Sequence, residues 1–312
     1  MMKPLGLKGL IAAPHTPMHE DGSLNLANVA LQARWLEKSG VVGAFIGGTT
    51  GEWASVTVDE RKEIFDAWAG ESESIAVFAH VGHNCQADAI DMARHAAGLT
   101  GIHAISALSP SFFKPVDASA MAQYFAPIAA AAPNLPFYIY QIPGMTGVTV
   151  PIHQQIQANI DLIPTFAGVK FTEPDLFAFG RCKGLFGDKV ELMWGVDEIL
   201  ITGLAFGTKS AVGSTYNYAA PLYNAVIAAY DAGDHDRARV LSKLGIEMVD
   251  LLVEYGVMRA GKALMGLRGA ECGPTRLPIV PLTADEREEL FSRARALGFL
   301  QDQFLTANCE SV

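Results

Sequence analysis

The chain has 312 residues, a length that suits about two average domains or one large barrel. Hydrophobic residues make up 50% of the chain and charged residues 18%, which is too apolar for a disordered protein or a coiled coil. The 33 acidic residues outnumber the 23 basic ones, for a net charge of -10, and no run of five like charges occurs. The charge pattern therefore argues against a nucleic-acid partner and against a polybasic membrane patch.

The cysteines and the hydropathy pattern indicate where the protein works. Four cysteines lack CxxC spacing, which fits free thiols in a reducing compartment better than a disulfide framework or a metal site. They are Cys85, Cys182, Cys272 and Cys309. Residues 1–14 are broken by proline and glycine and do not read as a signal peptide, and no stretch has the roughly 18 apolar residues of a membrane span. We expect a cytoplasmic protein with no membrane partner.

Short apolar runs alternate with longer helical patterns along the chain, which predicts parallel strands joined by crossover helices. The predicted strands are residues 9–13, 43–47, 75–81, 104–108, 137–142, 167–171, 191–195 and 210–213. The predicted helices between and after them are residues 26–38, 58–69, 86–97, 118–132, 153–160, 176–185, 198–205 and 221–232. Eight strand and helix pairs favour an α/β fold of the (β/α)8 TIM-barrel type, although an open doubly wound sheet has the same alternation.

The chain continues after the eighth unit. A helical period over residues 237–255, a segment rich in proline and glycine near 273–281 and a last helix over 284–297 predict a C-terminal helical extension. We therefore divide the chain into a barrel that carries the active site, residues 1–232, and an extension, residues 233–312. Two helix starts, at Thr57 with Glu60 and at Thr283 with Glu286, have the spacing of a capping box.

Lys170 is the outstanding candidate for chemistry, because active sites of such barrels lie at the carboxyl ends of the strands. The period of two along a strand places Gly168, Lys170 and Thr172 on one face, so Lys170 would point into the barrel near its upper rim. A buried lysine tends to lose its proton, and the free amine is the nucleophile that forms a Schiff base with a carbonyl. The alternative is an ion-paired lysine, or one whose ammonium reaches solvent.

Tyr140 ends the preceding predicted strand and would lie beside Lys170 at the same height. A phenol at that point can carry protons to and from the intermediates of Schiff-base chemistry. The alternative is a core tyrosine, for which Tyr138 on the same face is an example.

Three other strand ends carry polar residues. Residues 47–52, Gly-Gly-Thr-Thr-Gly-Glu, form a turn that suits a small anion such as a carboxylate but is too short and lacks the lysine of a phosphate-binding loop. Asp197 and Glu198 after the seventh strand could accept hydrogen bonds from a polyol, and capping of the following helix is the better explanation for one of them. The eighth strand leads into residues 212–217, Val-Gly-Ser-Thr-Tyr-Asn.

Other chemistries lack their motifs. The eight histidines form no H-E-x-x-H set, and His80 and His83 are predicted to hydrogen-bond locally, so we predict no metal. No G-x-S-x-G elbow is present, which disfavours a serine hydrolase.

Taken together and in order, these motifs resemble the pyruvate-dependent class I aldolase family that contains dihydrodipicolinate synthase and N-acetylneuraminate lyase. The family's G-T-T-G-E loop matches residues 48–52, its Y-x-x-P-x-x-T-G motif residues 140–147 and its G-x-K strand residues 168–170. The resemblance implies that Lys170 forms the Schiff base with pyruvate and that Tyr140 relays protons. It implies that Thr49 and Thr50 hold the pyruvate carboxylate, that no cofactor is needed and that the protein is a homotetramer.

Within the family, the sequence resembles the N-acetylneuraminate lyases most. The resemblance implies that five residues contact the sugar part of the substrate, namely Thr172, Gly195, Asp197, Glu198 and Ser214. Dihydrodipicolinate synthases carry an arginine where this chain has Met145, and a tyrosine pair where it has Ser111 and Phe112. The second change also departs from lyases that keep a tyrosine in this loop, which leaves the proton path there open.

The reaction implied is retro-aldol cleavage of N-acetylneuraminate into N-acetylmannosamine and pyruvate. One alternative is a related aldolase or dehydratase that acts on another 2-keto sugar acid, such as 2-keto-3-deoxygluconate. The other is a sugar-acid sensor that has the barrel but no turnover.

Overall fold

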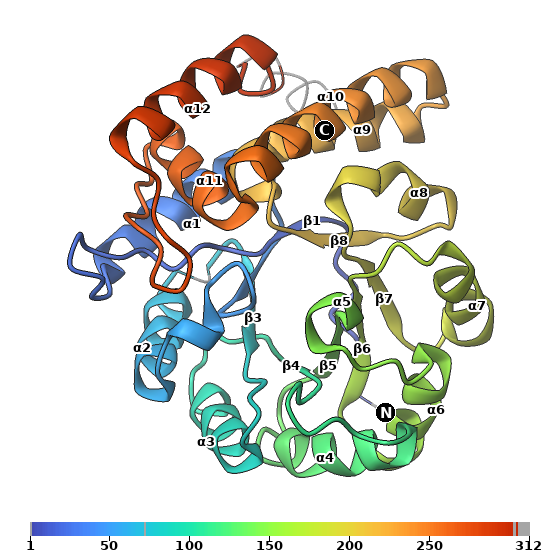
Figure 1. Cartoon of the computed structure of the whole chain (residues 1–312). Coiled ribbons are helices and arrows are strands. Elements are labelled where there is room, and N and C mark those ends of the chain that lie inside the picture. The colour runs from blue at the N-terminus through green and yellow to red at the C-terminus, as the bar shows by residue number, and fades with distance from the viewer. Residues whose placement is uncertain (1, 72, 302–303, 305–312) are drawn as a thin grey trace.

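A computed structural model describes residues 2–71, 73–301 and 304 (Figure 1). Within these residues, eight parallel strands pair in chain order and close into a barrel. The strands are β1 (Gly9–Ala12), β2 (Gly43–Ile46), β3 (Ala76–His80), β4 (Ala104–Leu108), β5 (Phe137–Gln141), β6 (Phe166–Phe171), β7 (Glu191–Trp194) and β8 (Ser210–Gly213). Pairing of β1 with β8, from Gly9 opposite Ser210 to Ala12 opposite Gly213, confirms the TIM barrel and excludes the open sheet.

Helices surround the barrel, as Figure 1 shows. They are α1 (Val29–Lys38), α2 (Val58–Ala69), α3 (Gln86–Ala97), α4 (Ala118–Ala130), α5 (Pro143–Thr146), α6 (Ile152–Leu162), α7 (Leu176–Phe186), α8 (Leu200–Ala205) and α9 (Tyr216–Asp231). Short 3-10 turns precede some of them: η1 (Leu26–Asn28), η2 (Trp53–Ser55) and η3 (Asp197–Ile199). None of the helices in the described residues combines the length and apolarity needed to span a membrane.

The strands are buried on both faces, which explains their continuous apolar runs. One apolar cluster lies between the sheet and the helices, and a smaller one fills the barrel interior. The interior cluster includes Phe45, Phe78, Tyr138, Tyr140 and Met193. The barrel is therefore a packed core rich in aromatic side chains, two of which, Phe45 and Tyr140, contact Lys170.

Both predicted capping boxes are present, at the starts of α2 and α12 (Ala284–Leu297). The largest error in a predicted boundary is at α9, which begins at Tyr216 and not at Pro221. Pro221 lies in the first turn of the regular segment that follows the non-helical Ala219, a place where its missing N–H is tolerated. A kink at Ala219, with φ of -125°, joins this segment to a preceding helical turn that the sequence pattern did not show.

The C-terminal segment consists of α10 (His235–Tyr255), α11 (Val257–Leu264), η4 (Met265–Arg268) and α12. These helices form a layer along one side of the barrel, beside α9 and α1 (Figure 1). The helical extension was predicted, but α11 was not. The division at residue 232 stays a prediction, and Cys309 lies outside the described residues.

Candidate functional site

Lys170 lies inside the barrel, as predicted. It is paired with Tyr140 across β5 and β6, and only 4% of it is exposed. Its ammonium nitrogen lies 4.0 Å from the centroid of the Tyr140 ring and 4.2 Å from that of the Phe45 ring. Close packing of β6 depends on Gly168, because a Cβ added there would lie 2.3 Å from the Glu191 carbonyl oxygen. The glycine of the G-x-K pattern is thus required by packing.

The surroundings of Lys170 favour the neutral amine. Burial lowers the pKa of Lys170 from 10.5 to about 7, and the Asp197 carboxylate opposes this shift only in part. Aromatic faces attract a cation, but they replace its hydration poorly, so the charged form remains disfavoured. A substantial fraction of Lys170 is therefore a nucleophilic amine near neutral pH.

Tyr140 is placed to carry a proton. Its hydroxyl lies 3.2 Å from the Thr49 hydroxyl, within hydrogen-bond distance. Burial raises the pKa of Tyr140 to about 12, with Thr49 lowering it and Asp197 raising it. The phenol is consequently protonated at neutral pH and can donate its proton when a neighbouring group gives it another. Tyr138, by contrast, donates a hydrogen bond to Glu191 at 2.8 Å in the lower barrel, as expected for a core tyrosine.

Residues 48–52 form a tight loop at the carboxyl end of β2, hereafter the 48–52 loop. The Thr16 hydroxyl donates a hydrogen bond to the Gly51 carbonyl oxygen at 2.7 Å, and Thr50 is buried. A Cβ added at Gly51 would lie 3.2 Å from the Gly47 Cα, so the loop cannot close as tightly with a larger residue. The loop places the Thr49 hydroxyl beside the phenol of Tyr140.

Asp197 is buried and faces the start of α9. Its carboxylate accepts hydrogen bonds from the Thr215 backbone N–H at 2.8 Å and from the Thr215 hydroxyl at 2.7 Å. Burial raises the pKa of Asp197 to about 6, and the Thr215 hydrogen bonds counteract part of the effect. Asp197 and Glu198 both lie in the first turn of η3, at the positive end of the next helical segment, as expected. Neither makes a capping hydrogen bond to η3 or α8, and Asp197 instead bonds at the start of the more distant α9. Glu198 is exposed.

Thr172, Gly195 and Ser214 line the neighbouring strand ends. The Thr172 hydroxyl oxygen is buried without a hydrogen-bond partner among the described residues. It lies against Gly195, where an added Cβ would be 2.4 Å from that oxygen. Ser214 is half-buried, and its carbonyl oxygen accepts a hydrogen bond from the Asn217 side chain. Thr172 thus offers an unused polar group at the rim of the barrel.

The structure brings some predicted site residues into contact and leaves others apart. Lys170, Tyr140 and Thr49 form one contact chain, and Asp197 acts on the first two through its charge. Glu198 is exposed and contributes no contact to that chain.

Sequence reasoning missed the buried support of this site. Arg61 of α2 is buried, donates hydrogen bonds to the carbonyl oxygens of His80 and Gly82, and lies over the ring of Trp53, the residue after the 48–52 loop. An arginine on the apolar face of a helix was the available signal. His83 hydrogen-bonds locally, as predicted, by accepting the backbone N–H of Cys85, whereas the partner of His80 is the Gly47 carbonyl oxygen, 33 positions away.

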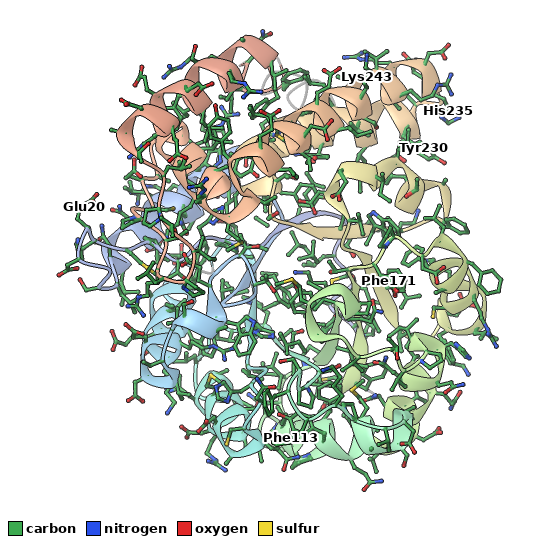
Figure 2. All side chains as sticks on the ribbon, in the orientation of Figure 1. Glu20, Phe113, Phe171, Tyr230, His235 and Lys243 are labelled. Atoms are coloured by element: carbon green, nitrogen blue, oxygen red, sulfur yellow. The ribbon has the colours of Figure 1, made fainter. Side chains whose placement is uncertain are left out.

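Two positions at which this chain differs from the expected pattern of dihydrodipicolinate synthases, Met145 and the pair Ser111 and Phe112, lie in segments that follow β5 and β4. Met145, at the position where dihydrodipicolinate synthases were expected to carry an arginine, lies on α5 and is exposed. The loop after β4 is held by Asn84, whose side-chain oxygen accepts the backbone N–H groups of Ser111 and Phe112. Phe113 follows in the same loop, in the lower part of the view in Figure 2, and is 85% exposed. Within the described residues, no group of three or more His, Cys, Asp or Glu side chains is arranged to hold a metal ion.

Comparison with known proteins agrees with this geometry. The model of the dihydrodipicolinate synthetase family matches residues 6–297. The chain belongs to this family. It is 37% identical over 290 residues to N-acetylneuraminate lyase of Danio rerio, covering 91% of this chain and 94% of the relative.

Solved structures of family members are also similar. N-acetylneuraminate lyase of Proteus mirabilis has 41% identity and a TM-score of 0.92, covering 94% of this chain and 99% of that one. Sialic acid aldolase of Ruminococcus gnavus, solved as a catalytic lysine mutant, has 28% identity and a TM-score of 0.89, covering 97% of this chain and 100% of that one. The family fold thus extends over nearly all of the chain.

Proposed function

We propose that this protein is a Schiff-base lyase that cleaves N-acetylneuraminate into N-acetylmannosamine and pyruvate. The observation that carries the proposal is the buried Lys170 amine, with its pKa lowered to about 7, in contact with the Tyr140 ring. The names of the relatives, N-acetylneuraminate lyase and sialic acid aldolase, supply the substrate. No cofactor takes part, because the protonated imine itself accepts the electron pair of the broken bond.

The reaction begins when the free amine of Lys170 attacks the C2 ketone of the open-chain sugar acid. Loss of water gives a protonated imine, which draws electrons from the C3–C4 bond as that bond breaks. Tyr140 takes up the proton of the C4 hydroxyl as it passes its own phenol proton to the substrate carboxylate. N-acetylmannosamine leaves, the remaining enamine takes at C3 the proton that its carboxylate returns through Tyr140, and water hydrolyses the imine to release pyruvate and regenerate Lys170.

Binding of the substrate is divided between two sets of residues. Thr49 and Thr50 hold the carboxylate of the keto acid in the 48–52 loop, which the 3.2 Å approach of Thr49 to the Tyr140 hydroxyl supports. The sugar part is held by residues at the ends of β6, β7 and β8. These are Thr172, Gly195, Asp197, Glu198 and Ser214. The unpartnered Thr172 hydroxyl is the strongest support for this second set.

Reductive trapping tests the proposal directly. The protein is incubated with N-acetylneuraminate and borohydride, and its peptides are analysed by mass spectrometry. We expect a reduced pyruvyl adduct on Lys170, which shows both the imine and the cleavage because the pyruvate must come from the sugar. Lys170→Ala removes the nucleophile, so the adduct and the release of N-acetylmannosamine should both disappear.

Other outcomes separate the alternatives. An adduct with pyruvate but not with N-acetylneuraminate would keep the aldolase chemistry and refute the substrate, which a panel of 2-keto sugar acids would then identify. No adduct with either compound, together with saturable sugar-acid binding, would favour the sensor. Normal cleavage by Lys170→Ala would refute the mechanism.

Assembly and location follow as further parts of the proposal. We propose a homotetramer, supported by exposed apolar side chains gathered near the loop after β4, which a partner subunit would cover. They are Phe112, Phe113, Val116 and Met145. Light scattering after size-exclusion chromatography should give four times the 33.3 kDa chain mass.

The exposed free thiol of Cys85 supports a reducing compartment such as the cytoplasm, which fractionation of the source cells tests.

A further inference from the structure

Glu52, the last residue of the 48–52 loop, has an unusual backbone conformation. Its φ is 58°, and it is the only residue other than glycine with positive φ among the described residues. Residues with a Cβ rarely adopt this left-handed conformation, and they keep it only where surrounding contacts enforce it. Contacts of the Glu52 side chain therefore determine how the loop ends.

Those contacts come from the C-terminal segment, far away in sequence. Lys262 of α11 places its ammonium nitrogen 2.7 Å from one carboxylate oxygen of Glu52, and the backbone N–H of Arg276 donates to the other oxygen at 2.9 Å. The ion pair is withdrawn from solvent, with the Lys262 and Glu52 side chains 1% and 0% exposed. Both oxygens of the carboxylate are thus held by residues outside the barrel.

The same segment also holds the chain on either side of the loop. The Arg276 guanidinium donates to the carbonyl oxygen of Ser55 at 2.9 Å, just after the loop, and to the Glu60 carboxylate on α2. It also donates to the Gly22 carbonyl oxygen. In Figure 1 the segment before α12 runs beside the N-terminal loop and α2. The C-terminal segment therefore hydrogen-bonds both to Glu52, the last residue of the loop, and to Ser55, three residues later.

A buried ion pair is a costly means of stabilising a fold, because two charges must leave water, and an apolar pair of similar size often serves better. Its advantage is directional, since a carboxylate gripped at both oxygens has one orientation. Three residues before Glu52, the Thr49 hydroxyl lies 3.2 Å from the Tyr140 hydroxyl. A change in the orientation of Glu52 would be passed along this short loop to Thr49 and Thr50.

We propose that Lys262 is a positioning residue which, through Glu52, holds the 48–52 loop in the geometry that binds the keto-acid carboxylate. The inference rests on the proposed function, in which this loop binds that carboxylate. The C-terminal segment, which adds no strand to the barrel, thereby contributes to recognition of the substrate.

The test compares a charged and a neutral ketone, pyruvate and methyl pyruvate, in reductive trapping at Lys170. Lys262→Met removes the buried cation, and Lys243→Met is the control, since Lys243 lies on the outer surface of α10 and is largely exposed (Figure 2). We expect Lys262→Met to need roughly tenfold more pyruvate for half-maximal trapping, as befits a weakened hydrogen bond to a charged group, with methyl pyruvate nearly unchanged. Lys243→Met should match the wild type with both ketones.

A second variant keeps the test valid if Lys262→Met alone does not fold. Glu52→Gln combined with Lys262→Met leaves no buried charge at the pair, so it should fold even if Lys262→Met alone does not, and it should show the same selective loss with pyruvate. A folded variant of either kind that keeps the wild-type preference for pyruvate overturns the inference. If neither variant folds, the pair serves folding and not positioning, and the inference is also overturned.

The wild type itself separates this inference from the proposed function. If wild-type protein traps methyl pyruvate as readily as pyruvate, carboxylate recognition by the loop is refuted, and the inference falls with it. If the wild type strongly prefers pyruvate, the proposed role of the loop stands whatever the variants show.

Discussion

The protonation of Lys170 leads to a prediction that pH alone can test. With a pKa of about 7, roughly half of the Lys170 side chains are free amines at pH 7. A lysine of pKa 10.5 would have only about one free amine in 3,000 at that pH, from a difference of about 3.5 pH units. The rate of imine formation with pyruvate should therefore fall about tenfold per pH unit below about pH 6 and level off above about pH 8.

The assay measures the initial rate of reductive trapping from about pH 5.5 to pH 10 at a low, fixed pyruvate concentration. Cyanoborohydride reduces imines over this range, and mass spectrometry quantifies the adduct on the peptide that contains Lys170. The same reaction with Nα-acetyllysine, after its rate is divided by the free-amine fraction expected for a pKa of about 10.4, corrects for the pH dependence of the reagent. A corrected rate that continues to climb tenfold per unit up to pH 10 would refute the view that burial suppresses the charge of Lys170.

The variant Asp197→Asn tests whether the Asp197 charge raises the pKa of Lys170. The Asp197 carboxylate raises the pKa of Lys170 against the larger effect of burial, so its removal should move the midpoint of the profile below pH 7. Asparagine retains an oxygen that can accept the Thr215 hydrogen bonds, which preserves the local structure. A midpoint that rises in this variant would contradict the electrostatic argument.

Three further substitutions separate chemistry from packing. Tyr140→Phe should reduce sugar-acid cleavage by about 10²–10⁴-fold, the usual contribution of a proton-transfer group, while pyruvate trapping at Lys170 persists; equal loss of both would contradict a proton relay. Gly168→Ala should destabilise the protein by at least about 1–3 kcal/mol in urea unfolding, because the added Cβ would overlap the Glu191 carbonyl oxygen at 2.3 Å. Lys262→Met should cost about 3–5 kcal/mol by leaving the Glu52 carboxylate buried and unpaired, and addition of Glu52→Gln should recover part of that loss.

The arrangement of Lys170 and Tyr140 could be predicted from sequence because it depends on two short-range regularities. Alternation of apolar and helical segments places consecutive strands side by side, and the period of two within each strand selects the inward face. The observed pairing of Tyr140 with Lys170 confirms both steps. The capping boxes of α2 and α12 could be predicted for the same reason, since each involves residues three apart.

The support around the site could not be predicted, because it depends on pairs that are distant in sequence. Glu52 and Lys262 are separated by 210 positions, and the partner of Asp197 is Thr215 on the next strand end. The sequence around Lys262, Ala-Gly-Lys-Ala, shows a lysine among small residues, which permits burial without naming a partner. Nothing in a local pattern distinguishes this lysine from an exposed one.

The contact between Asp197 and Thr215 also explains how a carboxylate can lie near Lys170 without neutralising the effect of burial. A direct ion pair would stabilise the ammonium and return the pKa of Lys170 toward its ordinary range. Thr215 instead holds one Asp197 oxygen through two hydrogen bonds, which direct it toward the start of α9. Gly213 makes room for this, because a Cβ there would lie 2.3–2.5 Å from the carboxylate atoms of Asp197. The Gly-Ser-Thr turn after β8 therefore helps to keep the Lys170 amine uncharged, and in the closed barrel only β1 separates this turn's strand from β2, which leads into the 48–52 loop.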